Sequence, residues 1–447
     1  MKASAYNHFI RAGNRTLAYN AVSNGLALID DEVLKALRSP ESIDPLILSR
    51  LQGESATLLR ELKRGRFVIE SDFDEVEYLR LLYNRAKYDV VAAGLTIAPT
   101  LDCNFNCPYC YEEQRSSRMT DEVKQHLCRY VAQIVKVARS FQVTWYGGEP
   151  LLCPDVIEEL SKEFLKACEE NHCAYHASIV TNGSLLTRET ALALKEHKIE
   201  TAQITLDGPR EVHDSRRCYR DGRGSFDTIV ANIEATRDVL RIAIRVNVDK
   251  TNMDHIVELF TYLRDRGILQ EGQTANAYLG HVHAPTAACK DIESNCLDAE
   301  GFSRFELDVM KQLSERGFHL SRYPDLRMGS CGAVRPYVFV VDPEGNLYKC
   351  WHSIGISDEV VGHISRPGEM TAAHLKWLSF DPFKFPECLS CKIFPICMAG
   401  CPDTAMKGGI ATGESCERWR YYLDDMLRLH AENVRRAKES GKVEAAG

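Results

Sequence analysis

The chain has 447 residues, of which 45% are hydrophobic and 26% charged, and its formal net charge is −8. This composition is typical of a globular protein with two or three domains, each burying its own core. The negative charge argues against a general nucleic-acid surface, and no apolar run resembles a signal peptide or reaches membrane-spanning length. We therefore expect a cytoplasmic protein without a nucleic-acid or membrane partner, whose 17 cysteines are reduced thiols.

Residues 1–90 are predicted to form a small domain of their own. Short strands at 6–12, 16–20 and 26–29 are separated by turns rich in Gly and Asn. Asp30 and the acidic residues after it begin a helix that runs to Leu37. Further helical patterns near 43–52 and 55–64 precede a strand at 66–70.

Residues 91–316 are predicted to alternate between strands and helices. The strands lie near 93–99, 141–147, 176–182, 201–207, 241–248 and 274–280, and the helices near 120–137, 155–170, 188–197, 225–239, 253–267 and 302–316. Six such units predict an α/β fold with parallel strands and helical crossovers. Because a closed barrel of this kind has eight units, we expect an open, partial (β/α)6 barrel with its chemistry at the carboxyl ends of the strands.

Three cysteines directly after the first of these strands carry the strongest chemical signal. Cys103, Cys107 and Cys110 have the spacing C-x3-C-x2-C. Three thiolates so close together can bind three irons of a 4Fe–4S cube and leave the fourth iron open. A zinc knuckle is the alternative, but it needs four ligands, and no further Cys or His follows within the next dozen residues. The motif resembles the radical S-adenosylmethionine (SAM) superfamily, in which SAM chelates the open iron and is cleaved to a 5′-deoxyadenosyl radical.

Polar residues at the ends of later strands extend this resemblance. Thr205 and Asp207 share one face of the fourth strand, and Arg245 and Asn247 share one face of the fifth. A solvated face of an incomplete barrel is the structural alternative. The resemblance implies that SAM is bound by Tyr109, Gly147, Gly148, Glu149, Thr181, Asn182, Thr205, Asp207, Arg245 and Asn247. In that family the Gly-Gly-Glu motif holds the amino group of SAM, and Arg245 is a suitable partner for its carboxylate. No catalytic acid or base is predicted.

Residues 317–430 are rich in cysteine, and their spacing resembles the SPASM domain, which carries two auxiliary 4Fe–4S clusters. The resemblance assigns Cys331, Cys350 and Cys401 to the first auxiliary cluster, and Cys388, Cys391, Cys397 and Cys416 to the second. A zinc ribbon on Cys388, Cys391, Cys397 and Cys401 is the alternative, but it leaves three cysteines unexplained. The first cluster lacks a fourth cysteine nearby, which leaves an open iron or a distant ligand such as Cys296. Residues 431–447 are predicted to be the end of a charged helix and a tail.

The resemblance covers residues 91–430 and predicts an enzyme with three 4Fe–4S clusters and SAM. It implies hydrogen abstraction from a ribosomally made precursor peptide, with flavodoxin or ferredoxin as the reductant. Residues 1–90 resemble the winged-helix domains that bind leader peptides, and a cap packed on the barrel is the alternative.

Two other functions compete with this prediction. Sulfatase maturases, which form formylglycine, have a similar layout but typically carry an aspartate directly after the cysteine that corresponds to Cys350. Here Trp351 and His352 follow it. A non-catalytic iron–sulfur electron carrier or redox sensor would need no SAM pocket.

Overall fold

The computed structural model describes residues 1–13, 15–38, 56–269, 276–318, 322–328 and 331–439. The chain divides into two compact units. Unit 1 comprises Met1–Tyr88, Asp298–Cys331 and Phe380–Gly447, and unit 2 comprises Asp89–Leu297 and Gly332–Ser379. Within the described ranges, no helix combines the length and the apolar character that crossing a bilayer requires.

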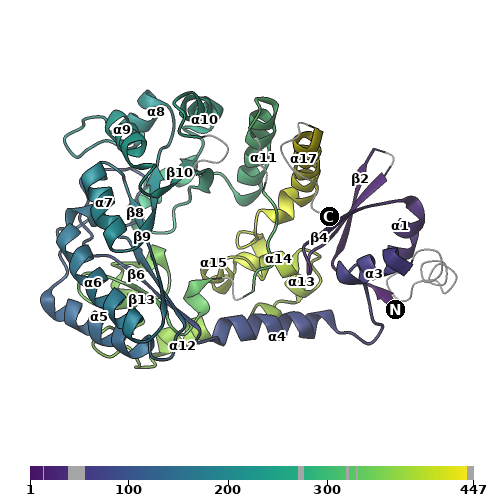
Figure 1. Cartoon of the computed structure of the whole chain (residues 1–447), viewed down its shortest axis with the longest axis horizontal. Coiled ribbons are helices and arrows are strands. Elements are labelled where there is room, and N and C mark those ends of the chain that lie inside the picture. Colours follow the sequence, from purple (N-terminus) through teal and green to yellow (C-terminus); the bar gives the residue numbers. More distant parts are fainter. Residues whose placement is uncertain (14, 39–55, 270–275, 319–321, 329–330, 440–447) are drawn as a thin grey trace. The chain divides into compact units, whose positions relative to one another are not determined.

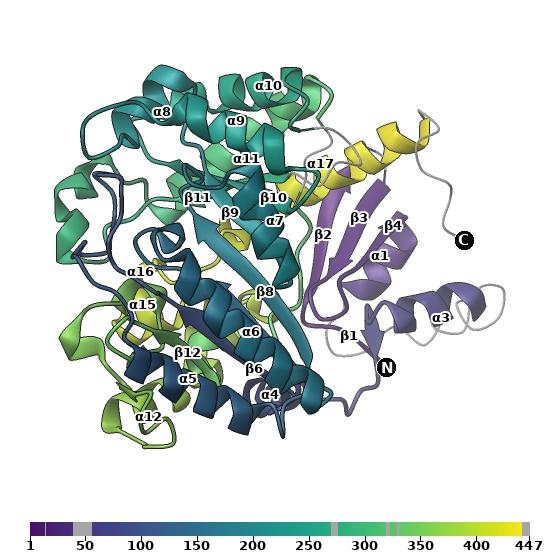
Figure 2. The same ribbon diagram turned by 60° about the vertical axis from the view of Figure 1, so that its left-hand side comes forward.

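Unit 2 is built on a mostly parallel sheet, which confirms the predicted α/β fold. The six predicted strands are β6 (Ala92–Ile97), β7 (Ser140–Trp145), β8 (Ala174–Thr181), β9 (Ile199–Thr205), β10 (Arg241–Val248) and β11 (Asn276–His281). Each pairs in parallel with the next along the chain. The helices that connect them are α5 (Asp121–Ile134), α6 (Pro154–Glu170), α7 (Arg188–Glu196), α8 (Arg210–Arg216), α9 (Phe226–Thr236) and α10 (Ile256–Asp265). All but α8 were predicted, and Figures 1 and 2 show α5, α6 and α7 along one side of the sheet.

The strands β7 and β8 bury alternate side chains on one face, whereas residues on the other face, such as Gln142 of β7, are partly or fully exposed. Val143 and Trp145 of β7 and Ile204 of β9 are fully buried. The helices start where a side chain can satisfy their first backbone N–H groups: Thr120 caps α5 and Thr187 caps α7. These connections return the chain to the same edge each time, so the carboxyl ends of the strands lie together.

Three further strands extend the sheet beyond the six that were predicted. β12 (Val338–Val341) pairs in parallel with β6, and β13 (Asn346–Tyr348) and β14 (Gly362–His363) follow in antiparallel order. In the described residues the sheet runs from β11 through β6 to β14. Cys350 lies two residues beyond the end of β13. The first cysteine motif follows β6, which is a strand of the same sheet.

Unit 1 contains the predicted N-terminal strands as an antiparallel sheet in the order β2 (Asn7–Ala12), β3 (Arg15–Asn20) and β4 (Gly25–Ile29). The helices α1 (Asp31–Leu37) and α3 (Ala56–Arg64) also follow the prediction. The strand predicted at 66–70 is the short β5 (Val68–Ile69), which pairs with an unpredicted β1 (Lys2–Ala3). The helix expected at 43–52 lies outside the described residues.

Three long helices complete unit 1: α4 (Glu75–Tyr88), which the sequence did not predict, α11 (Ala299–Glu315) and α17 (Trp419–Glu439). Leu307 and Met310 of α11 pack on Met426 of α17. The cysteine-rich segments are connected by short helices, namely α13 (Pro386–Leu389), α14 (Phe394–Cys397), α15 (Pro402–Met406) and α16 (Gly409–Thr412), while α12 (Ala372–Leu378) belongs to unit 2.

Candidate active site

The loop after β6 gathers the three cysteines of the first motif. Cys103 is buried and Cys107 and Cys110 are half-buried. Burial, together with the negative charges of Glu149 near Cys103 and Glu112 near Cys110, raises the pKa of both thiols to about 12, and Cys107 contributes to both values. The donor set is entirely sulfur and shielded from water, which suits a 4Fe–4S cluster. Binding of iron would displace the thiol protons, as metal binding to cysteine generally does.

Gly147 and Gly148 of the Gly-Gly-Glu motif lie close to the backbone of Thr100 and Asp102, where the cysteine loop begins. The N–H of Gly148 donates to the carbonyl of Thr100 at 3.2 Å, and the N–H of Glu149 donates to the carbonyl of Asp102 at 2.8 Å. A Cβ on Gly148 would lie 2.2 Å from the Asp102 oxygen. Side chains at this position are therefore excluded by the backbone that leads into Cys103.

The Glu149 carboxylate ties this motif to the end of β8. It is fully buried and accepts hydrogen bonds from the Thr181 hydroxyl at 2.8 Å and from the Asn182 N–H at 2.7 Å. Burial raises the pKa of Glu149, and these donors oppose the rise. The Asn182 amide in turn lies 3.9 Å from Cys103 Sγ and donates to Asn104 at 2.7 Å. Three of the predicted SAM-binding residues thus form one hydrogen-bonded group against the first cysteine.

A second group forms around Asp207, just beyond β9. Its fully buried carboxylate accepts hydrogen bonds from the Tyr109 hydroxyl at 2.5 Å and from the Asn247 N–H at 3.0 Å. Asn247 also accepts a hydrogen bond from Arg245 Nε at 2.7 Å. Arg245 pairs with Thr205 on the neighbouring strand, so the remaining predicted residues lie together at the ends of β9 and β10.

Two arginines at the end of α8 belong to this group, and sequence reasoning missed them. Arg216 is buried between Asp207, at 3.4 Å, and Asp249, at 2.9 Å. Arg217 donates to the Tyr109 hydroxyl at 2.6 Å, and its charge opposes the rise in the pKa of Cys107 that burial causes. The sequence feature that could have identified them is the pair of adjacent arginines in the connection after Asp207.

A set of rings adjoins the cysteine loop on the side of Cys110. Tyr111 packs edge-on against His352 with ring centroids 4.7 Å apart, and His352 packs against His283 at 5.0 Å. Tyr146 packs against Trp351 at 4.7 Å. The residues that follow Cys350 therefore contact both the segment after Cys110 and the segment before the Gly-Gly-Glu motif.

The second auxiliary set of cysteines surrounds one cavity in unit 1. Its lining includes all four predicted ligands, namely Cys388, Cys391, Cys397 and Cys416. The zinc-ribbon alternative would use Cys401 in place of Cys416, but Cys401 is exposed and does not line this cavity. Within the described residues, no three His, Cys, Asp or Glu side chains converge on a single-ion site. Four thiols in the lining of one cavity fit the donor chemistry of a 4Fe–4S cluster.

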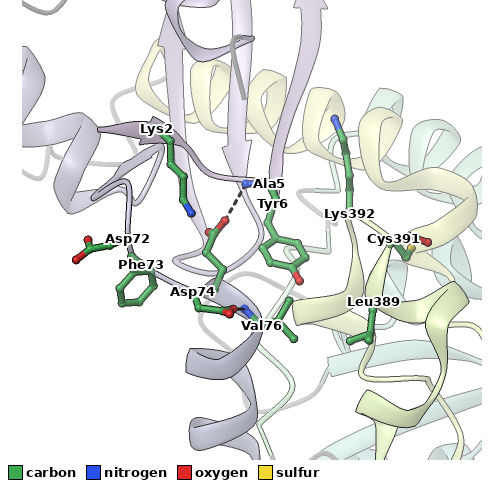
Figure 3. A pocket seen from close by; sticks show the side chains of 12 residues that line it. Lys2, Ala5, Tyr6, Asp72, Phe73, Asp74, Val76, Leu389, Cys391 and Lys392 are labelled. Atoms are coloured by element: carbon green, nitrogen blue, oxygen red, sulfur yellow. Dashed lines mark hydrogen bonds between the residues drawn. The ribbon is translucent and has the colours of Figure 1, made fainter. Parts of the chain in front are cut away.

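Cys391 also lines a larger hollow of about 410 Å³ on its other side (Figure 3). Asp74 and Val76, at the start of α4, and Tyr6 face the segment that carries Cys391 and Lys392 across this hollow. The cysteine loop of unit 1 is therefore approachable from solvent.

The first auxiliary set stays a prediction. Cys331 and Cys401 belong to unit 1, whereas Cys350 belongs to unit 2. Cys296, considered as an additional ligand, donates from its thiol to the Ile292 carbonyl at 3.5 Å.

Comparison with known proteins agrees with this site. Residues 97–263 match the model of the radical SAM superfamily. The serine-type anaerobic sulfatase-maturating enzyme of Klebsiella aerogenes is 23% identical over 349 residues, which are 73% of this chain and 82% of that enzyme. An uncharacterized protein of Synechocystis is 27% identical over 188 residues, and the match spans 40% of this chain and 46% of that protein.

Solved structures share the fold. Native anSMEcpe with bound AdoMet and Cp18Cys peptide superposes with a TM-score of 0.57 at 18% identity, covering 77% of this chain and 99% of that one. Streptococcus suis SuiB bound to precursor peptide SuiA superposes with a TM-score of 0.51 at 15% identity, covering 93% of this chain and 98% of that one. The cysteine loop that follows β6 and the strand ends that carry Glu149 and Asp207 thus lie within residues 97–263, the segment of this chain that is similar to the radical SAM superfamily of enzymes.

Proposed function

We propose that this protein is a cytoplasmic peptide maturase that modifies a ribosomally made precursor peptide. A 4Fe–4S cluster on Cys103, Cys107 and Cys110 would supply the electron that cleaves SAM, and the resulting 5′-deoxyadenosyl radical would take hydrogen from a carbon of the peptide. The observation that carries the proposal is the convergence of two hydrogen-bonded groups on the cysteine loop, around Glu149 and Asp207.

These two groups have different tasks in the proposal. Glu149 keeps Thr181 and Asn182 beside Cys103, so the position of the third strand end depends on its charge. Asp207 fixes Tyr109, the residue before Cys110, through a short hydrogen bond. Both carboxylates are inaccessible to water, which makes them rigid supports for a cofactor pocket. Arg245 stays the proposed partner of the SAM carboxylate.

The N-terminal sheet offers a place for a leader peptide. Within the described residues, β4 is an edge strand that pairs with β3 alone. Leu28 on β4 is 52% exposed, and half-buried Ala27 and Leu58 join β4 to α3 through a common apolar cluster. An exposed strand edge beside apolar side chains suits β-strand addition, in which the peptide pairs through its main chain. Among the similar structures, SuiB bound to its precursor peptide covers 93% of this chain.

Three clusters are proposed in all, with electrons supplied by a flavodoxin or ferredoxin. The four thiols around the unit 1 cavity support the second auxiliary cluster. Cys331, Cys350 and Cys401 are proposed for the first. Protein reconstituted without oxygen should then contain about twelve irons. The triple Ala variant of Cys103, Cys107 and Cys110 should lose about four irons together with SAM cleavage.

A sulfatase maturase is the second candidate, favoured by the relative from Klebsiella aerogenes. Such an enzyme would need a base near Cys350, and His352 is the only titratable side chain among the two residues that follow it. Formation of formylglycine in a sulfatase-derived peptide would establish this candidate. An electron carrier, as a third possibility, would not cleave SAM after reduction.

A matched pair of variants tests the leader site in the full-length protein. Leu28→Lys places a charge on the edge of β4, and Leu192→Lys places one on α7, where Leu192 is 48% exposed. Leu28→Lys should weaken binding of the proposed precursor peptide at least tenfold while leaving uncoupled SAM cleavage unchanged. Equal binding by both variants would rule out the β4 edge as the leader site.

A further inference from the structure

We propose that Arg420 sets the reduction potential of the second auxiliary cluster through its contact with the Cys416 sulfur. The inference rests on the proposed function, because it requires a 4Fe–4S cluster on the four thiols of the unit 1 cavity. Arg420 Nη1 donates to Cys416 Sγ at 3.3 Å, and the same side chain lines the cavity together with all four cysteines. Among the described residues that line this cavity, Arg420 is the only cation.

At the start of α17 the Arg420 side chain points to the cysteines. The side chains of Arg418 and Trp419, which precede it, have other partners. The N–H of Arg420 donates to the Glu417 carbonyl at 3.0 Å, which fixes the first turn. Arg418 points away and pairs with buried Glu306 at 2.7 Å. Trp419 packs against the apolar cluster of α11 and α17. Of the three consecutive side chains, Arg420 is the one that donates a hydrogen bond to a proposed ligand sulfur.

Other charges near the cavity are already paired or act through the backbone. The Glu417 carboxylate pairs with Arg327, while burial raises the pKa of Cys397 and the hydrogen bond that the Glu417 N–H donates to its sulfur opposes that rise. Glu387 is the acidic residue in the described lining of the cavity. The side chain of Lys392, next to Cys391, extends away from Cys391 in Figure 3. Arg420 is thus the positive charge most directly coupled to the sulfur ligands.

The direction of the effect follows from electrostatics. Reduction adds one electron, so it increases the negative charge that the four thiolates and the iron share. A cation hydrogen-bonded to a ligand thiolate stabilises the reduced form more than the oxidised form and raises the potential. Arg420 is exposed, so salt should screen the purely Coulombic part of its influence.

The test is a redox titration of full-length protein carrying the triple Ala variant of Cys103, Cys107 and Cys110, so that only the auxiliary clusters contribute. Dithionite with mediators is the reductant, and electron paramagnetic resonance is the readout. The signal that disappears in Cys416→Ala belongs to the second auxiliary cluster. Arg420→Gln should make its reduction about tenfold less favourable, which is a negative shift of about 59 mV for one electron. Arg420→Lys, which keeps the charge, should shift it less.

Arg428→Gln is the matched control, because Arg428 lies on the same helix and pairs with Asp425 at 3.0 Å. It should leave the potential unchanged, and the Arg420→Gln shift should shrink at high salt. An unshifted potential in Arg420→Gln with full iron content would overturn the inference. If Arg420→Gln does not retain the cluster, Arg420→Ala, which also removes the charge, is titrated in its place with the same expected shift and the same refuting result. Full iron content and unchanged signals in Cys416→Ala would instead refute the proposed cluster itself.

Discussion

Replacing Asp207 with Asn should destabilise unit 2 and loosen the cysteine loop. The buried carboxylate accepts hydrogen bonds from the Tyr109 hydroxyl at 2.5 Å and from Arg216 Nε at 3.4 Å. An amide keeps the shape but removes the charge and turns one acceptor into a donor. Breaking a buried charge pair costs about 3–5 kcal/mol, and the low end applies because Arg216 retains Asp249. We expect a loss of about 3 kcal/mol.

Thermal denaturation of anaerobically reconstituted protein, followed by circular dichroism, measures this loss. For a unit of this size the expected fall in Tm is about 6–12 °C. Asp238→Asn is the matched control: Asp238 pairs with Arg188 at 2.7 Å, but both side chains are more than half exposed. Such a surface pair contributes little to stability, because solvent screens the attraction between its charges. Equal Tm values for the two variants would refute the role of Asp207 as a buried support.

Three further predictions concern other buried groups. Glu149→Gln and Arg245→Ala should each weaken SAM binding measured by calorimetry, and unchanged affinity in both variants would place the SAM pocket elsewhere. Glu306→Gln should lower the stability of unit 1 by about 3–5 kcal/mol, because it removes the carboxylate that pairs with Arg418 and Arg322. The control is Glu300→Gln, on the exposed side of α11, which should have little effect on Tm. The fully buried His213 has a pKa well below the usual 6.5, so acid should favour unfolding below pH 6.5, by about 1.4 kcal/mol at pH 5.5. A His213→Gln variant with the same loss between pH 7.5 and 5.5 would exclude this residue as the cause.

The features that the sequence predicted correctly depend on neighbouring residues. Strands such as β8 and β10 carry an apolar pattern within eight residues, and the cysteine spacing lies within one loop. The strand-end residues Glu149 and Asp207 could be predicted because the ends of parallel strands share one edge of a sheet.

The features that it missed depend on distant contacts. β12 is a strand because it pairs with β6, more than 200 residues earlier. Arg216 and Arg217 join the site through the path of a loop, which no periodicity encodes. The close approach of Gly147 and Gly148 to the backbone oxygens of Thr100 and Asp102 was also not predicted, and the contact of these glycines with SAM stays a prediction.

The pairing of β12 with β6 has a consequence for how the protein is synthesised. Until Val338–Val341 have left the ribosome, one edge of β6 lacks the neighbour that it has in the folded protein. At about 5–20 residues per second, the interval between the two strands lasts roughly 12–48 s. During this time the nascent chain exposes one unpaired edge of an apolar strand beside the loop of three cysteines. Truncation before β12 would make this exposure permanent, so shortened forms should aggregate even though they retain the whole first cysteine motif.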